Sequence, residues 1–243
     1  MFYFLVAPYL VYHGLLIAAA AVPAIFLMIK VYRSDKLEHE SSHMIWELIK
    51  AGVFSALIAL VEERVLSVIL DLTVPYESPL YNIILYFGIV AFAEESSKYL
   101  MMKRKTWNNI EFNCQYDGVV YAVFVSLGFA LWENISYVMM YGFGTAIIRA
   151  VTAIPGHACF GVFMGIFYGI AKKYDYRGRS SASRTMRIVA VVAPALLHGA
   201  YDYIATMEAQ DGNWFFLGFV AMMFLITYIL VGRTAKADRP IIR

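Results

Sequence analysis

The sequence has few cysteines and little that matches the short motifs of the familiar soluble hydrolases. Cys159 lies in an apolar run and Cys114 in a basic loop, so no disulfide framework is expected. The serine-hydrolase motif GxSxG is absent, and the HExxH match from His39 to His43 lies in the charged loop after the first apolar run, outside the predicted spans. Neither cysteine has the sequence context of a catalytic nucleophile. The GxSxG hydrolase and cysteine peptidase interpretations therefore have no support, and an HExxH match in a loop does not by itself indicate a zincin, whose motif lies on a helix.

Charged residues are also scarce, at 16% of the 243 residues, whereas 61% are hydrophobic. Soluble domains are much less apolar, so the composition predicts a polytopic membrane protein. There is no internal repeat, low-complexity tract or stretch long enough for a soluble domain. The start of the chain lacks a charged n-region and a small-residue cleavage site, so its first apolar run is expected to be a retained span. Residues 1–243 are interpreted as one integral membrane domain.

The apolar runs predict an all-α fold, a transmembrane helical bundle of about seven spans. A span needs about 20 largely apolar residues. The candidates are residues 9–31, 45–70, 79–102, 116–142, 146–171, 186–207 and 213–232.

The basic residues predict the orientation of these spans. Of the 20 lysines and arginines, 16 lie in the first, third and fifth loops and the C-terminal tail. The second and sixth loops carry only acids, which are Asp71, Glu77, Glu208 and Asp211. Because cytoplasmic loops are enriched in lysine and arginine, the N-terminus is expected outside and the C-terminus in the cytoplasm of a multi-pass cell-membrane protein. The basic fifth loop is interpreted as a solvated face near anionic lipid, not a nucleic-acid site.

Ionisable and polar side chains occur inside the predicted spans, where each needs a reason. A charged group at the bilayer centre costs about 2.5–3.5 kcal/mol on insertion scales. The residues concerned are Glu94, Glu95 and Lys98 in the third span, Glu133 and Asn134 in the fourth, His157 in the fifth, and His198 and Asp202 in the sixth. A group at Glu62, Glu63 and Arg64 lies near the end of the second span and is interpreted as interfacial.

Helical spacing places several of these residues on shared faces. Glu94 and Lys98 are four apart and can pair, as can His198 and Asp202. Phe129 falls on the same stripe as Glu133. The spacing therefore predicts one hydrated cavity among the third to sixth spans, which holds the glutamates and histidines and has Glu133, Asn134 and Asp202 at its edge.

This set of residues suits peptide hydrolysis. A carboxylate in a low-dielectric pocket can act as the general base that activates water, and either Glu94 or Glu95 could do so. A histidine or Asn134 could donate hydrogen bonds to the developing oxyanion. The same residues could instead hold zinc through histidine and carboxylate ligands, so metal dependence stays open.

Two other function classes are considered. Buried carboxylates and histidines also relay protons in coupled transporters, but the inverted repeats and broken helices typical of transporters are not visible here. A non-catalytic membrane scaffold is the second alternative, in which the polar residues only satisfy one another. Apolar side chains would pack the helices at lower cost, which argues against this alternative.

Four motifs in order resemble the PrsW family of intramembrane proteases. They are EExxK at Glu94, Glu95 and Lys98, FxxxEN at Phe129, Glu133 and Asn134, HxxxG at His157 and Gly161, and HxxxD at His198 and Asp202. The flanking stretches YDGVVYA and YRSDKLEHE are also similar to the family, and the likeness covers roughly residues 20–210.

The resemblance implies a fold and a role that hydropathy does not give. It implies a glutamate-dependent or metal-dependent membrane endopeptidase, similar to the type II CAAX prenyl proteases and the gamma-secretase subunit APH-1. It further implies first-site cleavage of a single-pass anti-sigma factor as the partner and substrate. The likeness to APH-1 also keeps the non-catalytic alternative open.

Overall fold

The computed structural model describes residues 2–206 and 214–241, and their side chains from residue 10 onward. Over these ranges the fold is helical and has no strand, which confirms the all-α prediction. The elements are α1 (Phe2–Ser34), α2 (Ser42–Thr73), α3 (Tyr81–Ile83), η1 (Ile84–Val90), α4 (Ala91–Thr106), α5 (Asp117–Tyr141), α6 (Phe143–Val151), α7 (Ala153–Tyr176), α8 (Ser180–Thr206) and α9 (Trp214–Lys236). An isolated antiparallel bridge joins Cys114 to Pro240.

Helix α5 forms the centre of the bundle. Every residue from Asp117 to Ala130 is buried, because α5 contacts α1, α2, α4, α6 and α7. Glycines let α7 approach it closely. A Cβ atom on Gly165 would come within 2.4 Å of the carbonyl oxygen of Gly118, and one on Gly161 within 2.9 Å of Ser126 Oγ. Small residues commonly permit such close packing of membrane helices.

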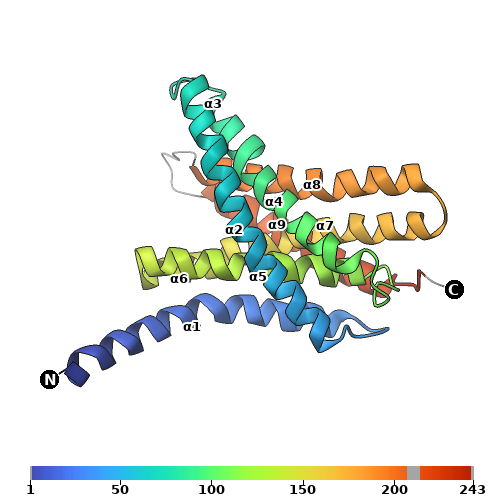
Figure 1. Ribbon diagram of the computed structural model, residues 1–243, viewed down its shortest axis with the longest axis horizontal. Helices are drawn as coiled ribbons and strands as arrows, with labels where there is room; N and C mark the ends of the chain where they lie inside the picture. Colours follow the sequence, from blue (N-terminus) through green and yellow to red (C-terminus); the bar gives the residue numbers. More distant parts are fainter. Residues whose placement is uncertain (1, 207–213, 242–243) are drawn as a thin grey trace.

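Helices α2 and α4 cross the rest of the bundle steeply. They run side by side across the level of α5, α7 and α8 (Figure 1). The segment η1, which leads directly into α4, is a π-helix, and such segments often occur at functional sites. This crossing brings the start of α4 against α8 and α5, so residues far apart in the sequence meet there.

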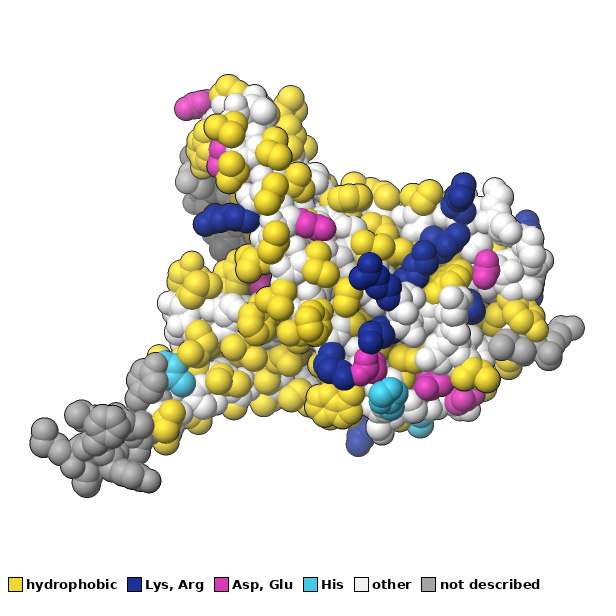
Figure 2. Space-filling model, viewed as in Figure 1, with side chains coloured by type: hydrophobic (Ala, Val, Ile, Leu, Met, Phe, Trp, Pro, Cys, Tyr) yellow, Lys and Arg dark blue, Asp and Glu magenta, His cyan; other side chains and the backbone are white. Residues whose placement is uncertain are grey.

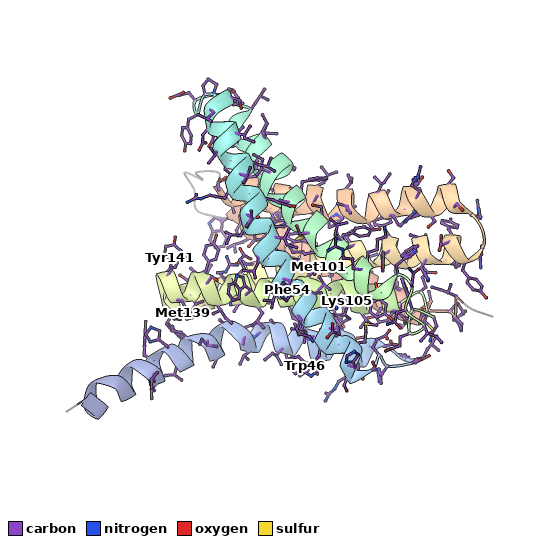
Figure 3. The ribbon with its side chains drawn as sticks, in the orientation of Figure 1. Trp46, Phe54, Met101, Lys105, Met139 and Tyr141 are labelled. Atoms are coloured by element: carbon purple, nitrogen blue, oxygen red, sulfur yellow. The ribbon has the colours of Figure 1, made fainter. Side chains whose placement is uncertain are left out.

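The surface is that of a membrane protein. Five helical segments of the described chain are long and apolar enough to cross a bilayer, namely Leu10–Ser34, Asp117–Tyr141, Phe143–Tyr176, Ser180–Thr206 and Trp214–Lys236. Hydrophobic side chains dominate the face in Figure 2, and the visible lysines and arginines gather mostly in one band. Large side chains such as Trp46 and Phe54 of α2 project from the bundle (Figure 3) with 64% and 58% of their area exposed. Lipid would cover such apolar surface.

The seven-span count stays a prediction. The predicted spans 45–70 and 79–102 coincide with helices α2, α3, η1 and α4, which are outside the set of five. The predicted span 146–171 was expected as one helix, but the structure divides it at Thr152 into α6 and α7. Pro155 explains the division, because a proline has no amide proton and clashes with the carbonyl four residues earlier, here that of Val151.

The orientation also stays a prediction, and two of the acids behind it, Glu208 and Asp211, lie outside the described residues. We expect a Ser181→Cys variant, at the exposed start of α8, to resist impermeant thiol reagents added to intact cells. The native Cys114 and Cys159 are both buried, which keeps background labelling low. Rapid labelling at position 181 in intact cells would reverse the orientation, and labelling after permeabilisation is the positive control.

Candidate active site

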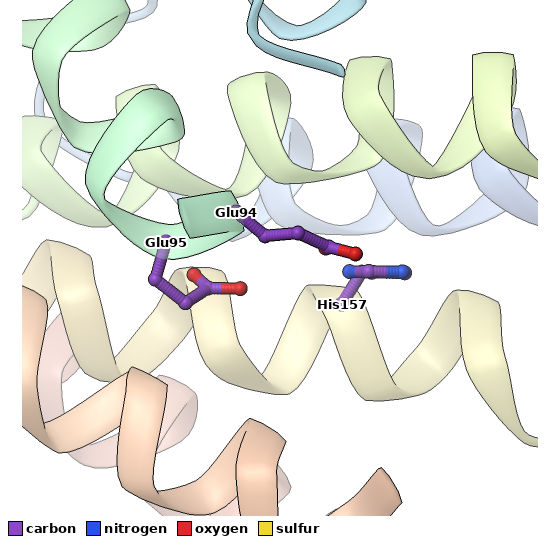
Figure 4. A group of neighbouring side chains, drawn as sticks. All are labelled: Glu94, Glu95 and His157. Atoms are coloured by element: carbon purple, nitrogen blue, oxygen red, sulfur yellow. The ribbon is translucent and has the colours of Figure 1, made fainter. Parts of the chain in front are cut away.

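Two adjacent glutamates, Glu94 and Glu95, lie at the start of α4. Figure 4 shows Glu94 reaching towards the ring of His157 on α7, while Glu95 leaves the helix in another direction. Lys98 follows one turn later, and its ammonium lies 3.0 Å from Glu94 Oε2 and 2.7 Å from Glu95 Oε1. Lys98 is completely buried, so these contacts replace its hydration. The structure thus contains the Glu94–Lys98 pair that the spacing predicts.

The Lys98 ammonium also determines how His157 is protonated. Its nitrogen lies 3.1 Å from His157 Nδ1 and 3.9 Å from the centre of the Phe129 ring. An ammonium can only donate, so Nδ1 must accept and the ring proton of a neutral imidazole is on Nε2. That Nε2 lies 2.8 Å from Glu133 Oε2 and can donate to it. His157 therefore joins the α4 carboxylates to Glu133 on α5.

His198 on α8 lies between carboxylates. Its Nδ1 is 3.0 Å from Glu95 Oε1, and its Nε2 is 3.4 Å from Asp202 Oδ2, one turn further along the same helix. The ring centres of His198 and His157 are 5.4 Å apart. Asp202 therefore lies beside the imidazole, as the four-residue spacing predicts.

A cavity of about 750 Å³ opens onto this cluster. Its wall includes most of the predicted site, namely Glu94, Phe129, Glu133, His157, His198 and Asp202. Glu95 and Lys98 do not line it. Glu95 has no exposed surface, and its Oε2 has no hydrogen-bond partner in the described chain. The two neighbouring glutamates therefore have different environments.

Asn134 does not lie where it was expected. It was predicted at the cavity edge, but it is fully buried and faces α1, where its amide donates to the carbonyl of Ala20 at 2.9 Å. Its side-chain oxygen accepts a bond from Nε of Arg149 on α6 at 2.9 Å. Helix α1 covers this side of α5, a contact between helices that spacing within α5 does not predict.

Arg149 is a site residue that the sequence analysis missed. It lines the cavity, its guanidinium lies 3.0 Å from Glu133 Oε2, and it stacks over the Tyr137 ring at 4.1 Å. Glu133 is thus held between Arg149 and His157. The signal in the sequence was a single arginine near the start of the fifth predicted span, residues 146–171.

Glu63 of α2 also lines the cavity, beside Leu60 of the same helix. The position of Glu63 along the chain predicted that it lies at the membrane interface, with Glu62 and Arg64. Helix α2 crosses the bundle steeply, so one of its faces forms a wall of the cavity (Figure 1). Glu62 and Arg64, one residue to either side, are exposed.

The donors around Lys98 fit a divalent metal in type and spacing. Glu94, Glu95 and His157 each offer one ligand atom, and these atoms all lie within 4.8 Å of one another. Two carboxylates and one imidazole are ligands that zinc accepts. The unpartnered Oε2 of Glu95 is a further free donor atom. The Lys98 ammonium already contacts all three side chains, so a metal held by them would displace it.

Comparison with known proteins agrees with this geometry. A model of the PrsW family of intramembrane metalloproteases matches residues 40–229. The chain is 31% identical to Protease PrsW of Bacillus subtilis (strain 168), and the match covers 93% of this chain and 96% of that protein. It is 30% identical to Protease PrsW of Oceanobacillus iheyensis, with 92% and 96% covered.

A third relative, Protease PrsW of Clostridioides difficile (strain 630), is 28% identical over 87% of this chain and 84% of its own length. No solved structure matches the chain. The family match spans most of the sequence and includes all of the helices from α2 to α8, and α9 as far as residue 229. The chain therefore belongs to the PrsW family of intramembrane proteases.

Proposed function

We propose that the chain hydrolyses a peptide bond of a membrane protein in the cavity bounded by α2, α4, α5, α7 and α8, with Glu94 as the general base. The observation that carries this proposal is the difference between the two glutamates. Glu94 lines the cavity, whereas Glu95 is fully buried and held by Lys98 and His198. Of these two glutamates, only Glu94 has access to a water molecule and a substrate carbonyl in the cavity.

Glu94 would take a proton from water as the oxygen attacks the carbonyl carbon, and would return it to the leaving amine as the C–N bond breaks. Its Oε2 accepts a hydrogen bond from the Lys98 ammonium at 3.0 Å, which holds the carboxylate in place. Glu95 would act as a positioning residue, because it fixes both Lys98 and His198.

The developing oxyanion needs hydrogen-bond donors inside the cavity. His198 lines it and can supply one, whereas the single ring proton of a neutral His157 is already donated to Glu133. Asn134 was also a candidate donor, but its amide group faces Ala20 and Arg149. We assign Asn134 instead to holding Arg149, which in turn holds Glu133 beside His157.

A metal bound by Glu94, Glu95 and His157 would supply Lewis-acid activation of water and carbonyl. The protein residues would still shape the cavity and hold the substrate. Glu133 would continue to orient His157 through its contact with Nε2. Asp202 would likewise continue to orient His198.

The finer proposal concerns the substrate. Helices long and apolar enough to cross a membrane form part of the cavity wall, which favours a substrate that is itself a membrane-spanning segment. We propose a single-pass anti-sigma factor, cut in the first step of its degradation. The support for this identity is the family resemblance of the four motifs.

The purified chain in proteoliposomes tests the function. We expect it to cut a single-pass anti-sigma factor from its own source and to leave an unrelated single-pass protein intact. Cleavage that survives thorough chelation would support the glutamate mechanism. Activity lost with chelator and restored by zinc would support a metallopeptidase. No cleavage of any single-pass substrate would favour the non-catalytic scaffold.

A further inference from the structure

Most acids in the cavity wall have a partner within the protein. Glu94 pairs with Lys98. Glu133 is held by Arg149 and His157. Asp202 lies beside His198, at 3.4 Å. Each of these three acids therefore has a partner before any substrate enters.

Glu63 is the exception. Among the described residues it is the one carboxylate in the cavity wall with no hydrogen-bond or ion-pair partner. The cavity wall also holds Leu60, Tyr86 and Val90, and the charged groups that act on Glu63, namely Glu94, Glu133, His198 and Lys98, already pair elsewhere. Ionisable residues in a membrane are costly and usually face a functional partner. Nothing in the described chain supplies that partner for Glu63.

We propose that Glu63 is a subsite for a cationic side chain, a lysine or arginine of the substrate close to the scissile bond. This inference rests on the proposed peptidase function. A cation on the substrate would pair with Glu63 inside a cavity that is partly shielded from water, where a charge pair is stronger than at an open surface. The pairing would thus favour binding of one class of segment over others.

The apolar part of the wall suits the rest of such a side chain. Lysine and arginine bury their aliphatic stems against apolar surface while the charged end reaches a polar group. Leu60 and Tyr86, which line the same cavity as Glu63, provide apolar surface for such a stem. The cavity's own guanidinium, on Arg149, is already committed to Glu133 and Asn134 and so does not neutralise Glu63.

A metal ion is a poorer fit to Glu63 than a substrate cation. Catalytic zinc sites use three protein ligands. The group of closely spaced donors in the described chain consists of Glu94, Glu95 and His157, and Glu63 is not part of it. A single carboxylate instead suits a monovalent organic cation that the rest of the substrate holds in place.

A charge-swap experiment tests the subsite with the full chain in proteoliposomes. The probe is a single-pass substrate whose cut bond has been mapped, with lysine, methionine or glutamate placed in turn at each position flanking that bond. For the wild type we expect kcat/KM to be about tenfold higher for lysine than for methionine at one flanking position. Glu63→Gln should remove this preference, and Glu63→Lys should reverse it in favour of glutamate.

Glu62→Gln is the matched control, because Glu62 is the adjacent exposed residue and should leave the lysine preference unchanged. A wild type that cuts the lysine and methionine substrates equally at every position would overturn the inference while leaving the peptidase function intact. A Glu63→Gln variant that keeps the full lysine preference would likewise overturn the inference and leave the peptidase function intact. A wild type that cuts no substrate would overturn the proposed function, and this inference with it.

Discussion

Replacement of Glu94 by glutamine is expected to abolish peptide cleavage while the protein still folds. Glutamine keeps the shape of the side chain and can still accept a hydrogen bond from Lys98, but it cannot take a proton from water. General-base catalysis contributes about 10²–10⁴-fold, so kcat should fall by that order. Stability should change little, because a neutral amide is less costly in a membrane than a carboxylate. The measurements are substrate cleavage in proteoliposomes and thermal melting in detergent.

Glu95→Gln is the natural comparison. Glu95 is fully buried and holds both Lys98 and His198, so this variant should lose stability as well as activity. The expected contrast is a folded but inactive Glu94 variant beside a destabilised Glu95 variant. Full activity in the Glu94 variant would refute its role as the base, and if the Glu95 variant were also fully active, the non-catalytic interpretation would be favoured.

Replacement of Lys98 by methionine is expected to cause the largest loss of stability in the site. The change removes the ammonium that contacts Glu94, Glu95 and His157 and leaves two buried carboxylates facing each other. Breaking a buried ion pair by removing one partner costs about 3–5 kcal/mol. The melting temperature should therefore fall on the order of 10 °C. Activity should fall too, because Glu94 and His157 lose the group that positions them.

Lys50→Met is the matched control for this prediction. Lys50 pairs with Glu47, but 58% of its side chain is exposed, and such surface pairs contribute about 0–1 kcal/mol. A second test is the double variant Lys98→Met with Glu95→Gln, which removes one of the two uncompensated carboxylates and should recover part of the lost stability. Equal melting temperatures for the Lys98 and Lys50 variants would show that the buried pair is not needed for stability.

Local spacing predicted the contacts made within one helix. The contact of Lys98 with Glu94 and the proximity of His198 to Asp202 both follow from residues four apart on one face. Hydropathy likewise predicted a helical membrane protein, because long apolar runs leave few other folds. These features depend on the chain near each residue, so the sequence contains the information for them.

Contacts between helices could not be predicted from local spacing or hydropathy. The approach of His157 to Lys98, the position of Asn134 against Ala20 and the part played by Arg149 depend on which helices are neighbours. Glu63 shows the same limit, because its position along the chain suggested the interface. The steep crossing of α2, which turns one of its faces towards the cavity, cannot be read from the periodicity of a single helix.

The central claim is that a buried carboxylate in this cavity cuts peptide bonds within the membrane. Mass-spectrometric mapping of the products from a single-pass substrate tests it most directly, with wild type and Glu94→Gln compared in the same proteoliposomes. The account predicts one main cut at a bond in or beside the substrate's membrane-spanning segment, made by the wild type and lost in Glu94→Gln. A cut that remains in Glu94→Gln, or one that lies only in a soluble part of the substrate, would contradict it.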